Sequence, residues 1–203
     1  MRRDPFPLDV TTLVIASVAV VSVAAWMSRS LKGALILNPY LVRERLQVYR
    51  LVTAGWIHAD ATHLIFNMIT LYFFSGWVLS VLGAGMFLVL FVSAVVVAHL
   101  PTTLRHMRNP RYNSLGASGG VAAVMFSAIL LHPSLKLSLF FLPIALPGPV
   151  YALGYLAYSA WSATGSRDGI NHDAHFTGAI YGALFAFALE PERVTRTVRA
   201  FLH

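Results

Sequence analysis

The sequence of 203 residues contains no cysteine, which excludes disulfides, thiol catalysis and cysteine-ligated metal centres. Charge is scarce as well, because only 11% of the residues are charged, whereas soluble domains carry about 25%. The low charge accompanies 57% hydrophobic residues and a mean hydropathy of +0.68. An ordinary soluble domain is therefore excluded, and the chain is predicted to be a membrane protein.

Acidic residues are few, and none of the eight lies inside an apolar run. They are Asp4, Asp9, Glu44, Asp60, Asp168, Asp173, Glu190 and Glu192. The His-Glu-x-x-His motif of zinc proteases is absent too. We therefore expect no metal and no other cofactor, and a transporter or metal-binding protein that uses the histidines is the weaker alternative.

Apolar runs alternate with turn-forming clusters along the chain. A helix needs about 20 apolar residues to cross a bilayer, so there is room for about six crossings. We predict one all-α domain over residues 1–203, a bundle of six transmembrane helices. The predicted spans are Val10–Met27, Thr62–Ser80, Gly85–Leu100, Ala117–Leu131, Pro149–Ala163 and Ala174–Leu189. The Arg-bearing stretch from Ser28 to Thr53 is predicted to lie in the membrane interface.

Polar motifs interrupt these apolar runs at three places. They are His58 with His63 and Asn67, the Gly-Ala-Ser-Gly sequence of residues 116–119, and His175 with Gly178 and Gly182. Polar side chains among lipid-facing helices are unfavourable unless they line a cavity or pair with one another. In a six-span chain the second, fourth and sixth helices begin at one membrane face, and each carries its motif near its start. The three motifs are therefore predicted to form one site.

Helical spacing assigns chemistry to this site. Asp60 can cap the second helix, which places His63 and Asn67 one turn apart on one face. Ser118 begins its helix, where unpaired N–H groups and the helix dipole favour negative charge. His175 shares a face with a Gly-x-x-x-Gly pair that lets helices approach closely, as a Ser-His hydrogen bond requires. Without a buried acid, we predict a Ser-His dyad.

Over nearly its whole length the chain resembles the rhomboid intramembrane serine proteases. The stretch from His58 to Met68 is similar to the family's second-helix motif, residues 116–119 to its nucleophile motif, and residues 175–182 to its general-base helix. The resemblance implies that Ser118 is the nucleophile and His175 the base. It also implies that His63, Asn67 and the Ser118 N–H hold the oxyanion.

Supporting roles follow from the same resemblance. His58 is implied to sit at the rim of the site, where it supports water or loop structure. Gly116 and Gly119 flank the nucleophile, and Gly178 and Gly182 pack the base helix against its neighbour.

Three further positions bear on the resemblance. Tyr49 and Arg50 resemble a Trp-Arg pair in the family's first loop, with Arg50 matching and Tyr49 departing from it. Ala122 is another departure, because an aromatic residue often stands one turn after the nucleophile and stacks on the base. This departure concerns the orientation of His175.

The predicted function is cleavage of transmembrane segments of other membrane proteins by a serine endopeptidase that forms an acyl-enzyme. The alternative is a non-catalytic rhomboid-like protein that binds transmembrane helices, and the intact Ser118 and His175 argue against it.

The net charge of +7 is spread over termini and loops, so lipid headgroups rather than nucleic acid are the expected partner. Six Lys and Arg residues lie on the predicted N-terminal side and nine on the opposite side. That count opposes the family's topology unless the interfacial residues of the first loop are discounted. The minimal size and the missing presequence favour a bacterial plasma membrane. Following the resemblance for orientation, we predict a multi-pass protein with its active site opening to the outer face.

Overall fold

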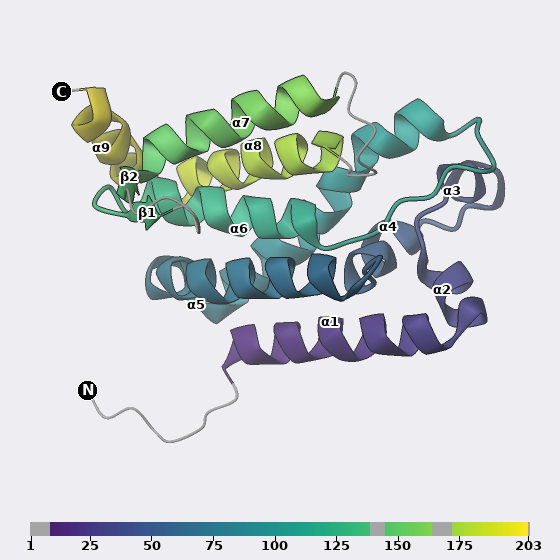
Figure 1. Ribbon diagram of the computed structural model, residues 1–203. Coiled ribbons are helices and arrows are strands. Elements are labelled where there is room, and N and C mark those ends of the chain that lie inside the picture. The colour runs from purple at the N-terminus through teal and green to yellow at the C-terminus, as the bar shows by residue number, and fades with distance from the viewer. Residues whose placement is uncertain (1–8, 139–144, 164–171, 203) are drawn as a thin grey trace.

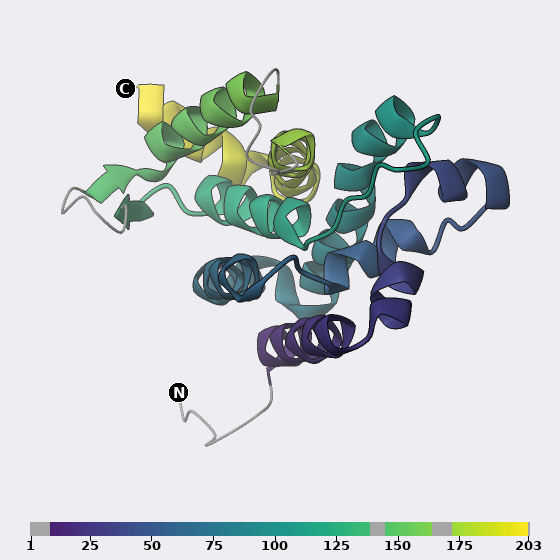
Figure 2. The ribbon, with the colours of Figure 1, turned by 45° about the vertical axis from the view of Figure 1, so that its right-hand side comes forward.

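A computed structural model describes residues 9–138, 145–163 and 172–202 (Figure 1). Its elements, in chain order, are α1 (Val10–Met27), α2 (Arg29–Leu35), α3 (Pro39–Arg45), α4 (Arg50–Thr53), the 3-10 helix η1 (Ala54–Trp56), α5 (Ala61–His106), α6 (Ser118–Leu131), β1 (Lys136–Ser138), β2 (Ala145–Pro147), α7 (Gly148–Ala163), α8 (His172–Leu189) and α9 (Pro191–Leu202). The long helices lie side by side, with α1 and α7 at opposite edges (Figures 1 and 2). The fold is mostly helical, as predicted.

Short polar side chains begin several of these helices. Asp9 accepts a hydrogen bond from the Thr12 N–H at the start of α1, and Asn38 accepts one from the Leu41 N–H at the start of α3. Asp60 accepts from the His63 N–H at 2.8 Å, which confirms it as the cap of α5. Each cap satisfies one of the donors that a helix leaves unpaired at its amino end.

A single glycine divides α5 into two halves. Gly83 has φ 73° and ψ 172°, a backbone conformation that side chains rarely adopt. The 46 residues of α5 would reach about 69 Å as one straight helix, more than twice the thickness of a bilayer core. The halves before and after Gly83 contain the second and third predicted spans.

The other predicted spans also fall on helices. Residues 10–27 form α1, and the ranges beginning at Ala117, Pro149 and Ala174 fall on α6, α7 and α8. Within the described residues, α1 and α5 are long and apolar enough to cross a membrane. The 14 residues of α6 extend about 21 Å, less than the bilayer core. The count of six crossings therefore stays a prediction.

Three features of the structure were not predicted. Residues 28–53 are folded into the short helices α2, α3 and α4, and the side chains of Ser28 and Asn38 cap the first two of them. Strands β1 and β2 pair antiparallel, so the fold is not purely helical. Helix α9 follows the last predicted span after a single residue, Glu190, and was missed because its apolar residues are too few to form a span.

Helix α6 is the centre of the bundle, and 12 of its 14 residues are buried. It packs against α5 and α8. A Cβ atom at Gly178 would lie 2.1 Å from the Gly119 carbonyl oxygen, and one at Gly182 would lie 2.1 Å from that of Ala123. The backbones of α6 and α8 are therefore in contact over one helical turn, and the buried Ser127 hydroxyl donates to the Gly182 carbonyl at 2.8 Å.

Replacement of Gly182 by alanine should separate α6 from α8, because the new methyl group would meet backbone atoms that cannot rotate away. We expect Gly182→Ala to lower stability by about 1–3 kcal/mol, the usual penalty for overpacking. Gly76→Ala is the matched control, since nothing lies within 4 Å of its Cβ position. Alanine there should stabilise α5 by up to about 1 kcal/mol. Thermal unfolding in detergent measures both, and equal melting temperatures would contradict the contact.

Candidate active site

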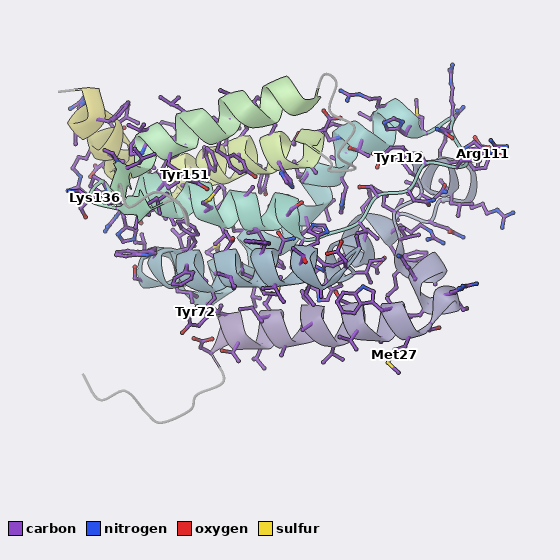
Figure 3. The ribbon with its side chains drawn as sticks, viewed as in Figure 1. Met27, Tyr72, Arg111, Tyr112, Lys136 and Tyr151 are labelled. Atoms are coloured by element: carbon purple, nitrogen blue, oxygen red, sulfur yellow. The ribbon has the colours of Figure 1, made fainter. Side chains whose placement is uncertain are left out.

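One cavity of about 900 Å³ collects the predicted catalytic and oxyanion residues. His63, Asn67, Ser118 and His175 all line it, although they come from the starts of three different helices. Its remaining walls come from α7 and from the connection between α5 and α6. Figure 3 labels a residue from each, Tyr151 on α7 and Tyr112 on the connection, and Tyr112 lies at the end of the bundle opposite Lys136.

The first turns of α5 supply one side of the cavity. His63 and Asn67 both face it, and the Asn67 side-chain amide donates to the His63 carbonyl at 3.1 Å. This bond fixes the orientation of an amide that is only 7% exposed. Two nitrogen-bearing side chains one turn apart are thus presented to the same cavity, as the spacing predicts.

His58 stands behind the site rather than in it. Its side chain is fully buried and does not line the cavity, so the predicted position at the rim is wrong. The Ala117 N–H donates to His58 Nε2 at 3.4 Å, which places the ring proton on Nδ1, 3.0 Å from the Ser22 hydroxyl. Ser22 in turn donates to the Trp56 carbonyl at 3.1 Å. His58 therefore supports loop structure, as the resemblance implies, by linking α1 to the residue before Ser118.

Burial governs the protonation of His58. Loss of hydration, reinforced by the neighbouring His63 and opposed by Asp60, lowers the pKa of His58 from its ordinary 6.5 to about 3. The ring is neutral at physiological pH, which its role as acceptor for the Ala117 N–H requires.

The residues just before Ser118 are held by three independent contacts. Ser114 pairs with Leu37 in an isolated bridge, and the Gly116 N–H donates to the Ala54 carbonyl at 2.8 Å. Gly116 has φ 115°, and a Cβ atom there would lie 2.7 Å from the His63 ring. Only glycine fits this position, because both the backbone conformation and the packing exclude a side chain.

Ser118 is the first residue of α6, so its side chain stands where the helix presents unpaired N–H groups. The next residue, Gly119, packs against Ala98 of α5 and the Ala174 carbonyl of α8. His175 follows Ala174 and precedes by one turn Gly178, which contacts Gly119. Ser118 and His175 therefore extend into the same cavity from two helices whose backbones touch.

An aromatic ring lies near His175 even though residue 122 is alanine. The Tyr155 ring of α7 stacks on the His175 ring, with centroids 6.3 Å apart and an angle of 22° between the planes. The resemblance implies an aromatic neighbour one turn after Ser118, on α6, and Ala122 departs from that pattern. The contribution from α7 depends on tertiary packing, which the sequence alone does not reveal.

Asp173, in the first turn of α8, pairs with a residue of α5. Its carboxylate forms an ion pair with Arg105 at the end of α5, where it ties the start of α8 to α5.

Arg50 has a structural place outside the cavity. Its guanidinium donates to the Gly33 and Ile36 carbonyls at 2.8 and 2.7 Å and to the Gln47 side chain at 2.7 Å. The side chain is buried and also lies over the Tyr49 ring, 5.4 Å from its centroid. The Arg50 side chain thus links α2 to α4 and stabilises the first loop.

Part of the cavity wall that was not predicted from the sequence comes from the connection between α5 and α6. Tyr112, Asn113 and Ser114 lie on the connection from α5 to α6 and line the cavity. Their polar character just before the nucleophile motif was the available signal. Asn113 also accepts a hydrogen bond from the Asn38 side chain at 3.2 Å, so this wall is tied to the start of α3.

Stability should depend on pH through His58. Between pH 6.5 and about 3 the unfolded chain binds a proton at this position that the folded chain does not. Stability is therefore retained above pH 6.5 and falls on acidification, by up to about 1.4 kcal/mol per pH unit in that window. We expect His58→Gln to be less stable at neutral pH but to show a flatter profile. Unfolding midpoints at several pH values test this, and parallel profiles for the two proteins would contradict it.

The model of the Rhomboid domain family matches residues 45–192. Among curated proteins, the chain is 29% identical over 154 residues to RHOMBOID-like protein 12, mitochondrial, of Arabidopsis thaliana, covering 68% of this chain and 45% of that protein. It is 27% identical over 179 residues to Rhomboid protein 1, mitochondrial, of Saccharomyces cerevisiae, covering 83% and 50%. It is 30% identical over 129 residues to the human Presenilin-associated rhomboid-like protein, mitochondrial, covering 62% and 34%.

These matches correct one prediction. The relatives are named as mitochondrial proteins, so the predicted bacterial plasma membrane, with the site opening to its outer face, is contradicted. The compartment was predicted from small size and a missing presequence, neither of which determines it. The chain spans half or less of the length of each relative. The family match covers most of the helical bundle and all of the cavity-lining residues, and the chain belongs to the rhomboid family.

Proposed function

We propose that this chain is a serine endopeptidase that cleaves transmembrane segments of other membrane proteins. The observation that carries the proposal is the shared cavity of Ser118, His175, His63 and Asn67, with Ser118 at the start of a buried helix. The rhomboid family generally contains serine intramembrane proteases, which supports the same function. A bundle of six transmembrane helices over residues 1–203 and a mitochondrial membrane, as in the named relatives, complete the proposal.

In the proposed reaction His175 takes the proton of the Ser118 hydroxyl, and the Ser118 oxygen attacks the carbonyl carbon of a substrate peptide bond. Collapse of the tetrahedral intermediate breaks the C–N bond, and His175 gives its proton to the leaving amine. Water, deprotonated by His175, then attacks the acyl-enzyme and releases the second product together with free Ser118.

Negative charge on the tetrahedral oxygen needs donors that are in place beforehand. The Ser118 N–H at the amino end of α6 is one, and the positive end of the helix dipole lies at the same point. The side chains of His63 and Asn67 are the others, and both are oriented by contacts already described. Gly116 and the buried His58 hold the backbone that precedes Ser118.

A transmembrane helix fits the cavity as substrate once it is locally unwound, because helical carbonyls are engaged in backbone hydrogen bonds. The cavity wall is partly apolar and includes Phe66, Val121 and Met125. The polar groups of the cavity lie around Ser118 and His175. The apolar side chains elsewhere in the wall can pack against the apolar residues of a transmembrane segment. Substrates with helix-weakening residues near the cleaved bond are therefore favoured.

A fluorophosphonate probe tests for an activated serine. We expect intact mass and peptide mapping to show labelling of the detergent-purified protein at Ser118, and no labelling of Ser118→Ala or His175→Ala. Thermal unfolding of each variant verifies that the fold is retained. Absence of labelling on folded wild-type protein would instead favour the non-catalytic protein that binds transmembrane helices.

The oxyanion role predicts graded losses of activity. Removal of one oxyanion donor typically lowers kcat by about 10²- to 10³-fold, so Asn67→Ala should retain measurable cleavage of a transmembrane substrate when Ser118→Ala retains none. Probe labelling and substrate cleavage should fall together in Asn67→Ala. A melting temperature far below that of wild type would show that the amide acts on the fold instead.

Stacking by Tyr155 should position the His175 ring. An aromatic pair contributes about 0.5–1.5 kcal/mol, so Tyr155→Ala should reduce kcat by about two- to tenfold with little change in KM. Tyr155→Phe keeps the ring and should behave like wild type. An equal loss in both variants would assign the effect to the hydroxyl rather than to stacking.

A further inference from the structure

Helix α9 has a basic side and an apolar side, and neither takes part in the proposed proteolysis. It spans Pro191–Leu202, whereas the family match ends at residue 192. At about 100° per residue, Arg193, Arg196 and Arg199 fall on one side of the helix. Val194, Val198 and Phe201 fall on the opposite side. The two kinds of residue thus form a basic face and an apolar face.

The apolar face is only partly covered by protein. Val194 is 5% exposed and packs in a cluster with Leu131 of α6 and Ala186 of α8, and Thr197 beside it is 1% exposed. Further along the helix, Val198 and Phe201 remain 43% and 40% exposed. The bundle therefore fixes one side of α9 and leaves two apolar side chains beyond its edge.

The basic face points away from this contact. Arg193 is half-buried, and its guanidinium lies 3.7 Å from the Glu190 carboxylate, a spacing that leaves a weak ion pair. Arg196 and Arg199 are exposed. A helix with exposed arginines on one side and exposed apolar residues on the other has the pattern of a segment lying in a membrane surface.

The placement of α9 agrees with that pattern. It lies at the end of the bundle where α6 and α8 finish, and it runs across their direction (Figures 1 and 2). Figure 3 places Lys136 at this same end, opposite Tyr112 beside the cavity. If the bundle crosses a bilayer, α9 lies along the membrane surface on the side away from the candidate active site.

We propose that α9 is an anionic-lipid docking helix, in which Val198 and Phe201 enter the bilayer and the exposed Arg196 and Arg199 bind acidic phospholipid headgroups. Arginine matches phosphate because its guanidinium forms two parallel hydrogen bonds to it. Each basic residue near an anionic membrane surface adds about tenfold or less to the preference for acidic lipid. The proposal stands independently of proteolysis, since α9 contributes no residue to the cavity.

The absence of cysteine allows a direct test. Val198→Cys carries a single environment-sensitive fluorophore, and the labelled full chain is reconstituted into vesicles of phosphatidylcholine, with or without phosphatidylglycerol. Emission wavelength and quenching by lipids spin-labelled near the headgroup report whether residue 198 enters the bilayer. Arg196→Gln with Arg199→Gln removes the two exposed charges. Arg43→Gln with Arg45→Gln is the matched control, because both arginines are exposed on α3 and lie away from α9.

We expect phosphatidylglycerol to shift the emission to shorter wavelength and to increase quenching. The α9 double variant should need roughly tenfold more phosphatidylglycerol for the same response. Added salt should weaken the response of the parent protein, because it screens exposed charges. The control variant should respond like its parent. Equal quenching in neutral and acidic vesicles, or an unchanged response in the α9 variant, would overturn the proposal.

Discussion

The arrangement of the helices depends on the tight backbone contact between α6 and α8. Gly178 against Gly119 and Gly182 against Ala123 leave no space for a side chain at either glycine. In a bilayer the lipid tails are as apolar as the helix surfaces, so helix association depends on such close packing and on interhelical hydrogen bonds. The Ser127 hydroxyl supplies one of these bonds at the second contact. The same approach brings the start of α8, and with it His175, beside Ser118.

At the end of the bundle that contains the cavity, polar groups form hydrogen bonds with defined partners in the protein. His58 accepts from the Ala117 N–H, the Ala54 carbonyl accepts from the Gly116 N–H, and Arg50 closes the first loop on two carbonyls. An unpaired polar group is unfavourable in a membrane. The irregular backbone before Ser118 is therefore stable because residues between α1 and α5 satisfy it, with the His58 ring and the Ala54 carbonyl as acceptors.

The sequence predicted most of what depends on local spacing. The positions of the long helices, the cap at Asp60, the facing of His63 and Asn67, and the glycine face of α8 all follow from helical periodicity and cap chemistry. The stacking of Tyr155 on His175 could not be predicted, because it depends on how α7 lies against α8. The burial of His58 was also missed, since a histidine before a helix gives no sign of which side of the loop it will face. Likewise, short helices such as α2 and α3 carry too few residues for a periodic signal.

Stability and proposed chemistry are assigned to different residues at this site. The residues that fix the backbone are His58, Gly116 and Gly178, and their contacts are made whether or not Ser118 has a hydroxyl. Ser118 and His175 line the cavity and are only partly buried, so their replacement removes few packing contacts. A chain with this fold could therefore lose its dyad and keep its cavity. For that reason a protease and a helix-binding relative can share this fold, and the proposed proteolysis depends on the serine and histidine themselves. Their presence together, on helices held in backbone contact, is what favours catalysis here.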